Sequence, residues 1–93
     1  MIKHFKCKEA EKIYHGQRSF KLPQDIQQKA LDKLVMLASA GRVEDLRVPP
    51  GNKLEKLSGD RMGQYSIRIN AQWRLCFSWT NGNAYQTEIV DYH

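Results

Sequence analysis

Cysteine and histidine are scarce in this chain of 93 residues, which contains two of the first and three of the second. Cys7 and Cys76 lie far apart and belong to no CxxC motif, so the sequence predicts reduced packing residues rather than a disulfide framework. The histidines are His4, His15 and His93. The single HxxC that His4 forms with Cys7 is more often a coincidence than a zinc site, so neither a metal nor another cofactor is expected.

Long apolar runs are also missing. The opening MIKHFKCKEAEK carries charges throughout and lacks the apolar core of a signal peptide, and no later stretch is long enough to span a bilayer. The chain contains no Gly-rich phosphate loop, GxSxG elbow or dinucleotide fingerprint. A soluble cytoplasmic protein without a membrane partner is therefore expected, and several common enzyme classes are excluded.

Acidic residues are outnumbered, with 10 Asp and Glu against 15 Lys and Arg and a net charge of +5. This excess favours an anionic partner such as nucleic acid, although a solvated basic surface kept for solubility has the same composition. The length suffices for one modest core, so residues 1–93 are expected to form a single domain.

Periodicity predicts an opening strand in MIKHFK, a helix over residues 7–14 ended by Gly16, and a longer helix from Pro23 to Gly41. The longer helix has one apolar stripe, formed by Ile26, Ala30, Leu34, Leu37 and Ala38. A stripe of this kind is more typical of a helix packed on a sheet than of a partner-binding groove.

Residues 41–63 contain two prolines and four glycines, and they read mostly as loop with a short strand near Leu54. Long connections inside a small domain are often functional. The candidate residues on this loop are Lys53, Glu55, Lys56, Ser58 and Arg61. The plain alternative is that they are solvated surface residues.

The last third predicts an antiparallel meander, because QYSIRIN, WRLCFSW and AYQTEIVDYH are rich in aromatic and β-branched residues. Asn81-Gly82 is typical of a type I′ hairpin turn. Alternation places Ile67 and Leu75 on a face that packs against the long helix, and Arg68 and Arg74 on the opposite, open face. The fold class predicted from these elements is α+β.

Two arginines on one face can cradle a phosphate, since each guanidinium is a permanently charged fork of donors. If the final strand pairs beside them, it brings Asp91, Tyr92 and His93 to the rim of that face. Metal-free RNA cleavage needs a base, an acid and cations, and these residue types can supply all three. Exposed arginines and polar tails are common, so the pattern alone is also compatible with an ordinary surface that has no catalytic role.

The stretches MIKHFK, SGDR, SIRINAQWRLCF and the terminal DYH resemble the RelE/ParE superfamily of toxin-antitoxin toxins, and within it the HigB-like branch. The resemblance implies two N-terminal helices packed on an antiparallel sheet of three to five strands. It also implies a metal-independent endoribonuclease that cleaves translated mRNA in the ribosomal decoding site. The implied partner is a HigA-like helix-turn-helix antitoxin, through which alone the toxin would reach operator DNA.

Carried over by resemblance, the active-site positions fall on Arg74, Asp91, Tyr92 and His93, with Arg68 as a weaker phosphate contact. Some relatives have a histidine and a lysine near SGDR, where this chain has Glu55 and Ser58. Glu55 can act as a base but repels phosphates, and the nearby cations are expected to offset that repulsion. Those cations are Lys53, Lys56 and Arg61.

A different class of function stays open at this point, namely a toxin that acts by binding. ParE-like members of the superfamily inhibit DNA gyrase, and a toxin can also serve only as the antitoxin's partner and corepressor. Such relatives generally lack the catalytic end of the chain. The terminal DYH therefore favours the nuclease.

Overall fold

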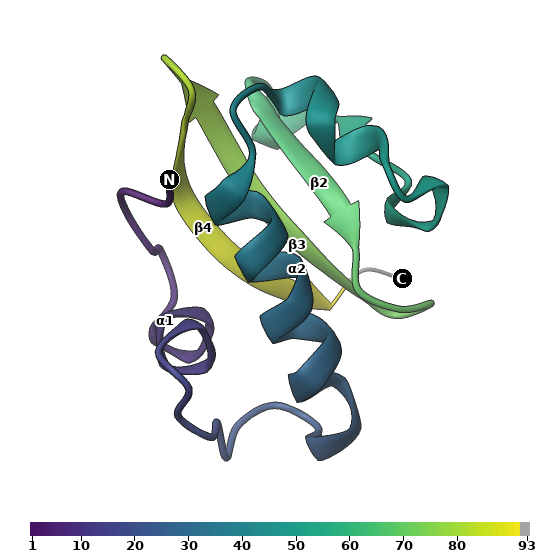
Figure 1. The fold of residues 1–93 in the computed structure, drawn as a ribbon. Coiled ribbons are helices and arrows are strands. Elements are labelled where there is room, and N and C mark those ends of the chain that lie inside the picture. Colours follow the sequence, from purple (N-terminus) through teal and green to yellow (C-terminus); the bar gives the residue numbers. More distant parts are fainter. Residues whose placement is uncertain (92–93) are drawn as a thin grey trace.

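The computed structural model describes residues 1–91, in which two helices lie on one face of an antiparallel sheet of order β1-β2-β3-β4 (Figure 1). The helices are α1 (Lys8–Tyr14) and α2 (Gln27–Ser39), and the strands are β1 (Glu55–Lys56), β2 (Gln64–Arg68), β3 (Trp73–Thr80) and β4 (Asn83–Asp91). The short 3-10 turns are η1 (Gln24–Ile26), η2 (Val43–Arg47), η3 (Pro50–Asn52) and η4 (Gly59–Arg61). The predicted α+β arrangement is confirmed. No helix within residues 1–91 combines the length and the apolar character needed to cross a membrane.

The first helix begins and ends close to the predicted residues. Cys7 is its N-cap, and the Cys7 Sγ accepts a hydrogen bond of 3.3 Å from the Ala10 N–H, which satisfies one of the unpaired amides of the first turn. Gly16, with a φ of 81°, follows the helix in the left-handed conformation that glycine adopts without strain. Cys7 therefore caps the helix as well as packing against the core.

The second helix starts later than predicted, because Pro23 precedes the 3-10 turn η1 and the α-helix itself begins at Gln27. The side chain of Gln27 holds the preceding loop, accepting from the Ser19 N–H and donating to the Ser19 carbonyl. The predicted stripe faces the sheet, with Ala30 and Leu34 fully buried. Burial of this face, rather than helix propensity, stabilises the helix.

The sheet is built around one tight hairpin, in which Asn81 and Gly82 have φ values of 51° and 79°. These left-handed values are those of a type I′ turn, as the Asn-Gly pair predicts. Ile67, Leu75 and Phe77 lie fully buried on the face that α2 covers. Figure 1 shows α2 lying across this face.

The last strand carries a β-bulge. Ser78 pairs with Tyr85 and Cys76 pairs with Glu88, so one extra residue of β4 lies between these two pairs. Gln86 in this bulge has a φ of 52°. Its backbone N–H donates to the Nδ1 of His4, 3.2 Å away, so a side chain from the N-terminal segment satisfies an amide that the bulge removes from the ladder.

The predicted opening strand does not form as a continuous strand. Ile2 and Phe5 make isolated parallel bridges to Ala84 and Thr87 of β4. These bridges lie on either side of Gln86, and the bulge interrupts the regular row of donors and acceptors that a continuous ladder needs.

Candidate active site

A row of four side chains crosses the sheet on the face that α2 does not cover. Glu55 pairs with Ser66, Ser66 with Cys76, and Cys76 with Glu88. Residues directly opposite each other in antiparallel strands point to the same face, so all four belong to one surface. We call this surface the site face and include Arg74, whose guanidinium binds Ser66.

Arg74 is the anchor of the site face, but it is buried rather than open, with 7% of its surface exposed. Its Nε donates to the Ser66 Oγ at 2.9 Å and its Nη2 donates to the Lys53 carbonyl at 2.7 Å. The prediction of an open arginine face is therefore wrong for Arg74. The loop before β2 crosses this face and closes over the guanidinium, because the Lys53 carbonyl accepts from the same Nη2 that donates to the Ser66 carbonyl at 3.5 Å.

The loop residue Glu55 reaches the same guanidinium. Its Oε1 lies 3.6 Å from the Arg74 Nη1, and its side chain is 49% exposed. A carboxylate thus occupies the solvent side of the buried arginine, where a phosphate would approach. The structure thus brings together Glu55 and Arg74, two of the predicted site residues, and Lys53 contributes its carbonyl oxygen to this contact.

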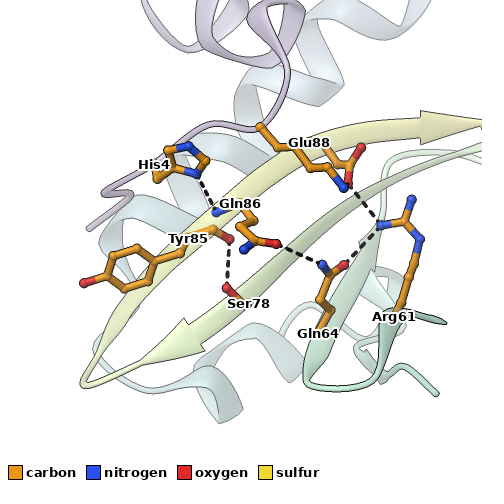
Figure 2. A network of polar contacts seen from close by, with 8 residues as sticks. His4, Arg61, Gln64, Ser78, Tyr85, Gln86 and Glu88 are labelled. Carbon is orange, nitrogen blue, oxygen red and sulfur yellow. Dashed lines mark hydrogen bonds and ion pairs between the residues drawn. The ribbon is translucent and has the colours of Figure 1, made fainter. Parts of the chain in front are cut away.

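Arg61 enters the site face from the 3-10 turn η4 on the other side of the row. Its Nη1 donates to the Gln64 Oε1 and lies 3.1 Å from the Glu88 Oε2 (Figure 2). Lys6 from the N-terminal segment lies 3.5 Å from the same carboxylate oxygen. Glu88 and Ser66 were not among the predicted site residues. The available sequence signal for Glu88 was an acid directly before the apolar pair Ile89-Val90.

Cys76 lies in the middle of the row and is fully buried. Burial raises the pKa of its thiol, and the nearby carboxylate of Glu88 raises it too, while Arg61 and Arg74 lower it. Loss of hydration outweighs the two arginines, so the thiol stays protonated at neutral pH. Cys76 is thus a packing residue of the site floor, because the thiolate is the nucleophilic form of cysteine.

The end of β4 lies next to the buried arginine. Val90 pairs with Arg74 and shares the site face, whereas Asp91 pairs with Trp73 at the last position of the strand. The Asp91 side chain therefore belongs to the opposite face of the sheet, and its predicted position on the rim of the arginine face is wrong. The Asp91 Oδ2 accepts a hydrogen bond of 3.1 Å from the Gln72 Nε2, which ties the strand end to the β2–β3 turn. The predicted catalytic residues Tyr92 and His93 lie outside the described residues.

The other predicted cationic residues, Arg68 and Lys56, lie at the margins of the site face. Arg68 pairs with Arg74 across β2 and β3, and it also lines a hollow of about 570 Å³ between β2 and α2. Lys29 and Lys33 of α2 line the same hollow. Lys56 is exposed on β1 and faces away from Glu55, its neighbour in the strand, while Ser58 is exposed just before η4.

A family model described as the RelE-like toxin of the type II toxin-antitoxin system HigB matches residues 3–93. The chain belongs to this HigB-like toxin family. Toxin HigB-1 of Vibrio cholerae is 41% identical over 90 residues, which are 96% of this chain and 95% of that protein. Endoribonuclease HigB of Proteus vulgaris is 33% identical over 93 residues, which are 100% of both chains.

Solved structures confirm the fold of this HigB-like toxin. A YoeB-YefM complex from Staphylococcus aureus matches with a TM-score of 0.58 and 21% identity, over 100% of this chain and 98% of that one. A second structure, of the heterotetrameric complex of the same pair, matches with a TM-score of 0.56 and 20% identity. The helices on an antiparallel sheet that the resemblance implied are therefore those of a RelE-like toxin.

The site face of the HigB-like toxin combines opposite charges at short range. Arg74 contacts Glu55 at the β1 end of the row, and Arg61 contacts Glu88 at the β4 end. Guanidinium groups held by hydrogen bonds can stabilise the charge that develops on a phosphate under attack. Carboxylates beside them can accept a proton or orient the arginines.

Proposed function

We propose that this toxin is an endoribonuclease that cleaves translated mRNA in the decoding site of the ribosome and so stops growth. The observation that carries the proposal is the pair of arginines on the site face, held by Ser66, Lys53 and Glu88 in a chain of the HigB-like family. The name Endoribonuclease HigB of the Proteus vulgaris relative supports the same reaction. Action on ribosomes would place the protein in the cytoplasm.

The reaction requires two proton transfers at one phosphodiester. A base removes the proton of the 2′-hydroxyl, the 2′-oxygen attacks phosphorus, and the bond to the 5′-oxygen breaks as an acid protonates that oxygen. We assign the proton transfers to Tyr92 and His93, with Glu55 as a further base, and we assign an orienting role to Asp91 at the end of β4. Arg74 and Arg61 supply positive charge for the phosphorane, and Lys53, Lys56 and Arg68 are assigned to the flanking phosphates.

The antitoxin is expected to be a HigA-like helix-turn-helix protein. Type II systems pair a toxin with a protein antitoxin, and the matching family is the toxin of such a system. The toxin would reach operator DNA only through this partner. Co-expression of the chain with a helix-turn-helix protein encoded beside it, followed by co-purification, tests this part of the proposal.

The test of the activity uses purified toxin and ribosomes carrying a defined mRNA with a vacant decoding site, with cuts mapped by primer extension. Cuts within the decoding-site codon, absent with the His93→Ala toxin, are the expected result. Cuts that persist in His93→Ala would keep the nuclease and move the chemistry to Glu55 and the arginines. Folded toxin that arrests growth without any cuts would instead favour a binding target such as gyrase.

Glu55→His is expected to raise the cleavage rate by ~10-fold, because an imidazole is a suitable base near neutral pH and does not repel phosphate. The Glu55 side chain is 49% exposed, and Arg74 keeps its hydrogen bonds to Ser66 and Lys53, so the fold should survive loss of the ion pair. Single-turnover rates on programmed ribosomes measure the effect. Glu55→Gln is the matched control, and an equal gain in that variant would assign the effect to charge alone. A rate unchanged or lower in Glu55→His would contradict the assignment.

Ribosome association is expected to weaken by about tenfold or more between about 50 mM and 200 mM salt, because phosphate contacts release counterions. Phosphate contacts are expected because the chain has a net charge of +5 and cationic side chains surround the site face. Filter binding or sedimentation of toxin with ribosomes at a series of salt concentrations measures the slope. A flat response would remove the phosphate contacts from the proposal.

A further inference from the structure

We propose that Glu88 is a positioning residue of the nuclease, which fixes the guanidinium of Arg61 on the site face so that it can act on the scissile phosphate. The inference rests on the proposed function, and it deepens that function by giving Glu88, which is not among the residues assigned to proton transfer or phosphate contact, a specific role through Arg61. It is carried by the contacts of Glu88, by the local geometry of Arg61 and by the polyanionic substrate.

The carboxylate of Glu88 is largely withdrawn from water, with 13% of its side chain exposed. Its Oε2 lies 3.1 Å from the Arg61 Nη1 and 3.5 Å from the Lys6 Nζ. A carboxylate that loses this much hydration is costly unless cations compensate it. Glu88 is therefore held between two positive groups that come from η4 and from the N-terminal segment, as Figure 2 shows for the Arg61 side.

Arg61 needs such a restraint because of where it lies in the chain. It ends the three-residue turn η4, which begins at Gly59 and is followed after Met62 by Gly63, and these two glycines have φ values of 64° and 90°. An arginine side chain carries about 2 kcal/mol of rotamer entropy, which a short turn between glycines does little to reduce. Contacts from outside the turn must therefore fix the guanidinium.

Two acceptors from the sheet supply these contacts. The Gln64 Oε1 and the Glu88 Oε2 each lie 3.1 Å from the same Arg61 Nη1. Gln64 is oriented in turn by the Gln86 Oε1, 3.5 Å from its Nε2, in the network of Figure 2. Side chains of β2 and β4, the two strands that flank β3, thus hold the guanidinium at the Glu88 end of the row.

A carboxylate on a face that binds RNA is unfavourable by its charge alone, because it repels the phosphates. Simple electrostatics therefore predicts that removal of the Glu88 charge strengthens RNA binding and speeds cleavage at low substrate. Positioning predicts the opposite effect on the chemical step, because an arginine that samples many rotamers stabilises the phosphorane poorly. The two explanations predict opposite changes in the cleavage rate of a variant that lacks the Glu88 charge, so kinetics can separate them.

The first experiment is a double-mutant cycle of Glu88→Gln and Arg61→Ala, assayed by mRNA cleavage on programmed ribosomes. We expect Glu88→Gln to lower kcat by ~10-fold or more while KM is unchanged or lower. In the Arg61→Ala background the same change should alter kcat by less than about two-fold, because Glu88 then has no arginine to position. Glu11→Gln, a change of an exposed acid on α1, is the matched control for loss of one negative charge.

Two results would overturn the proposal. A loss of equal size in both backgrounds would show that Glu88 acts independently of Arg61, and a faster Glu88→Gln would show that its charge merely opposes the substrate. Thermal unfolding of all variants accompanies the kinetics, so that a general loss of fold is recognised. If Glu88→Gln fails to fold, Glu88→Asp, which keeps the charge but shortens the reach, takes its place, with the same kcat loss in both backgrounds again counting against the proposal.

A second readout does not depend on RNA. The Arg61 N–H donates to the Ser58 carbonyl and the Met62 N–H to the Gly59 carbonyl within η4. In the free toxin, Glu88→Gln should speed hydrogen exchange at these two amides more than at those of α2, because the turn loses its tie to β4. Unchanged exchange there would overturn the proposal. A wild-type toxin that cuts no RNA would refute the proposed nuclease, while this exchange would still show whether Glu88 fixes Arg61.

Discussion

Cleavage of mRNA on the ribosome should fall by ~10²-fold or more when the chain is shortened to end at Asp91, while the protein stays folded. The truncation removes Tyr92 and His93, to which the proposed mechanism assigns proton transfer. The core that stabilises residues 1–91 is formed by α1, α2 and the sheet, with Ile67, Leu75 and Phe77 fully buried. Single-turnover cleavage and circular dichroism of the same preparation measure the two quantities.

The point variants Tyr92→Phe and His93→Gln divide the effect between the two side chains. A truncated protein without a folded circular-dichroism signal would assign the chain end to structure instead. A truncated protein that is folded and cuts at the wild-type rate would remove Tyr92 and His93 from the mechanism and leave Glu55 as the candidate base on the site face.

Arg74→Ala is expected to abolish measurable cleavage and also to lower the free energy of unfolding, by about 1–3 kcal/mol. The stability loss follows because the buried guanidinium donates to the Ser66 Oγ and the Lys53 carbonyl, which would lose a charged donor. Urea unfolding measures the second quantity. Activity data for Arg74 variants therefore need to be read together with stability.

Arg68→Ala is the matched control for Arg74, since the two arginines are cross-strand partners and Arg68 is only half-buried. Its free energy of unfolding should change by less than that of Arg74→Ala, and its cleavage should fall only moderately. Arg74→Lys keeps the charge without the planar fork, so it should recover part of the stability and little of the activity. Equal stability of Arg74→Ala and wild type would contradict the buried role of this arginine.

Local patterns were enough to predict the fold, because each element carries its own signal. The stripe of α2 identifies its buried side, and Asn81-Gly82 fixes the hairpin through backbone conformations that few residue pairs adopt readily. The prediction of a continuous opening strand was wrong, because residues 1–6 form only two isolated bridges. The pairing of this segment depends on β4, a strand that lies about 80 residues away in the sequence.

The site was harder to predict than the fold, because its contacts join distant segments. The sequence identified Arg74, Glu55 and Arg61 as candidates, and the structure brings them to one face. It did not reveal that the loop carbonyl of Lys53 covers Arg74, because a backbone acceptor has no signature in residue type. Glu88 escaped prediction for a related reason, since its partners lie in η4 and in the N-terminal segment.

The β-bulge at Gln86 exchanges the faces to which the odd-numbered and even-numbered residues of β4 point after it. Tyr85, before the bulge, faces the same side as Ser78, whereas after it the even-numbered Glu88 and Val90 share the side of Cys76 and Arg74. A ladder without the extra residue would place Glu88 opposite Leu75, against α2, and would bury a carboxylate in the core. The side of the sheet that Glu88 and Val90 face is thus decided upstream, by the backbone conformation of one residue.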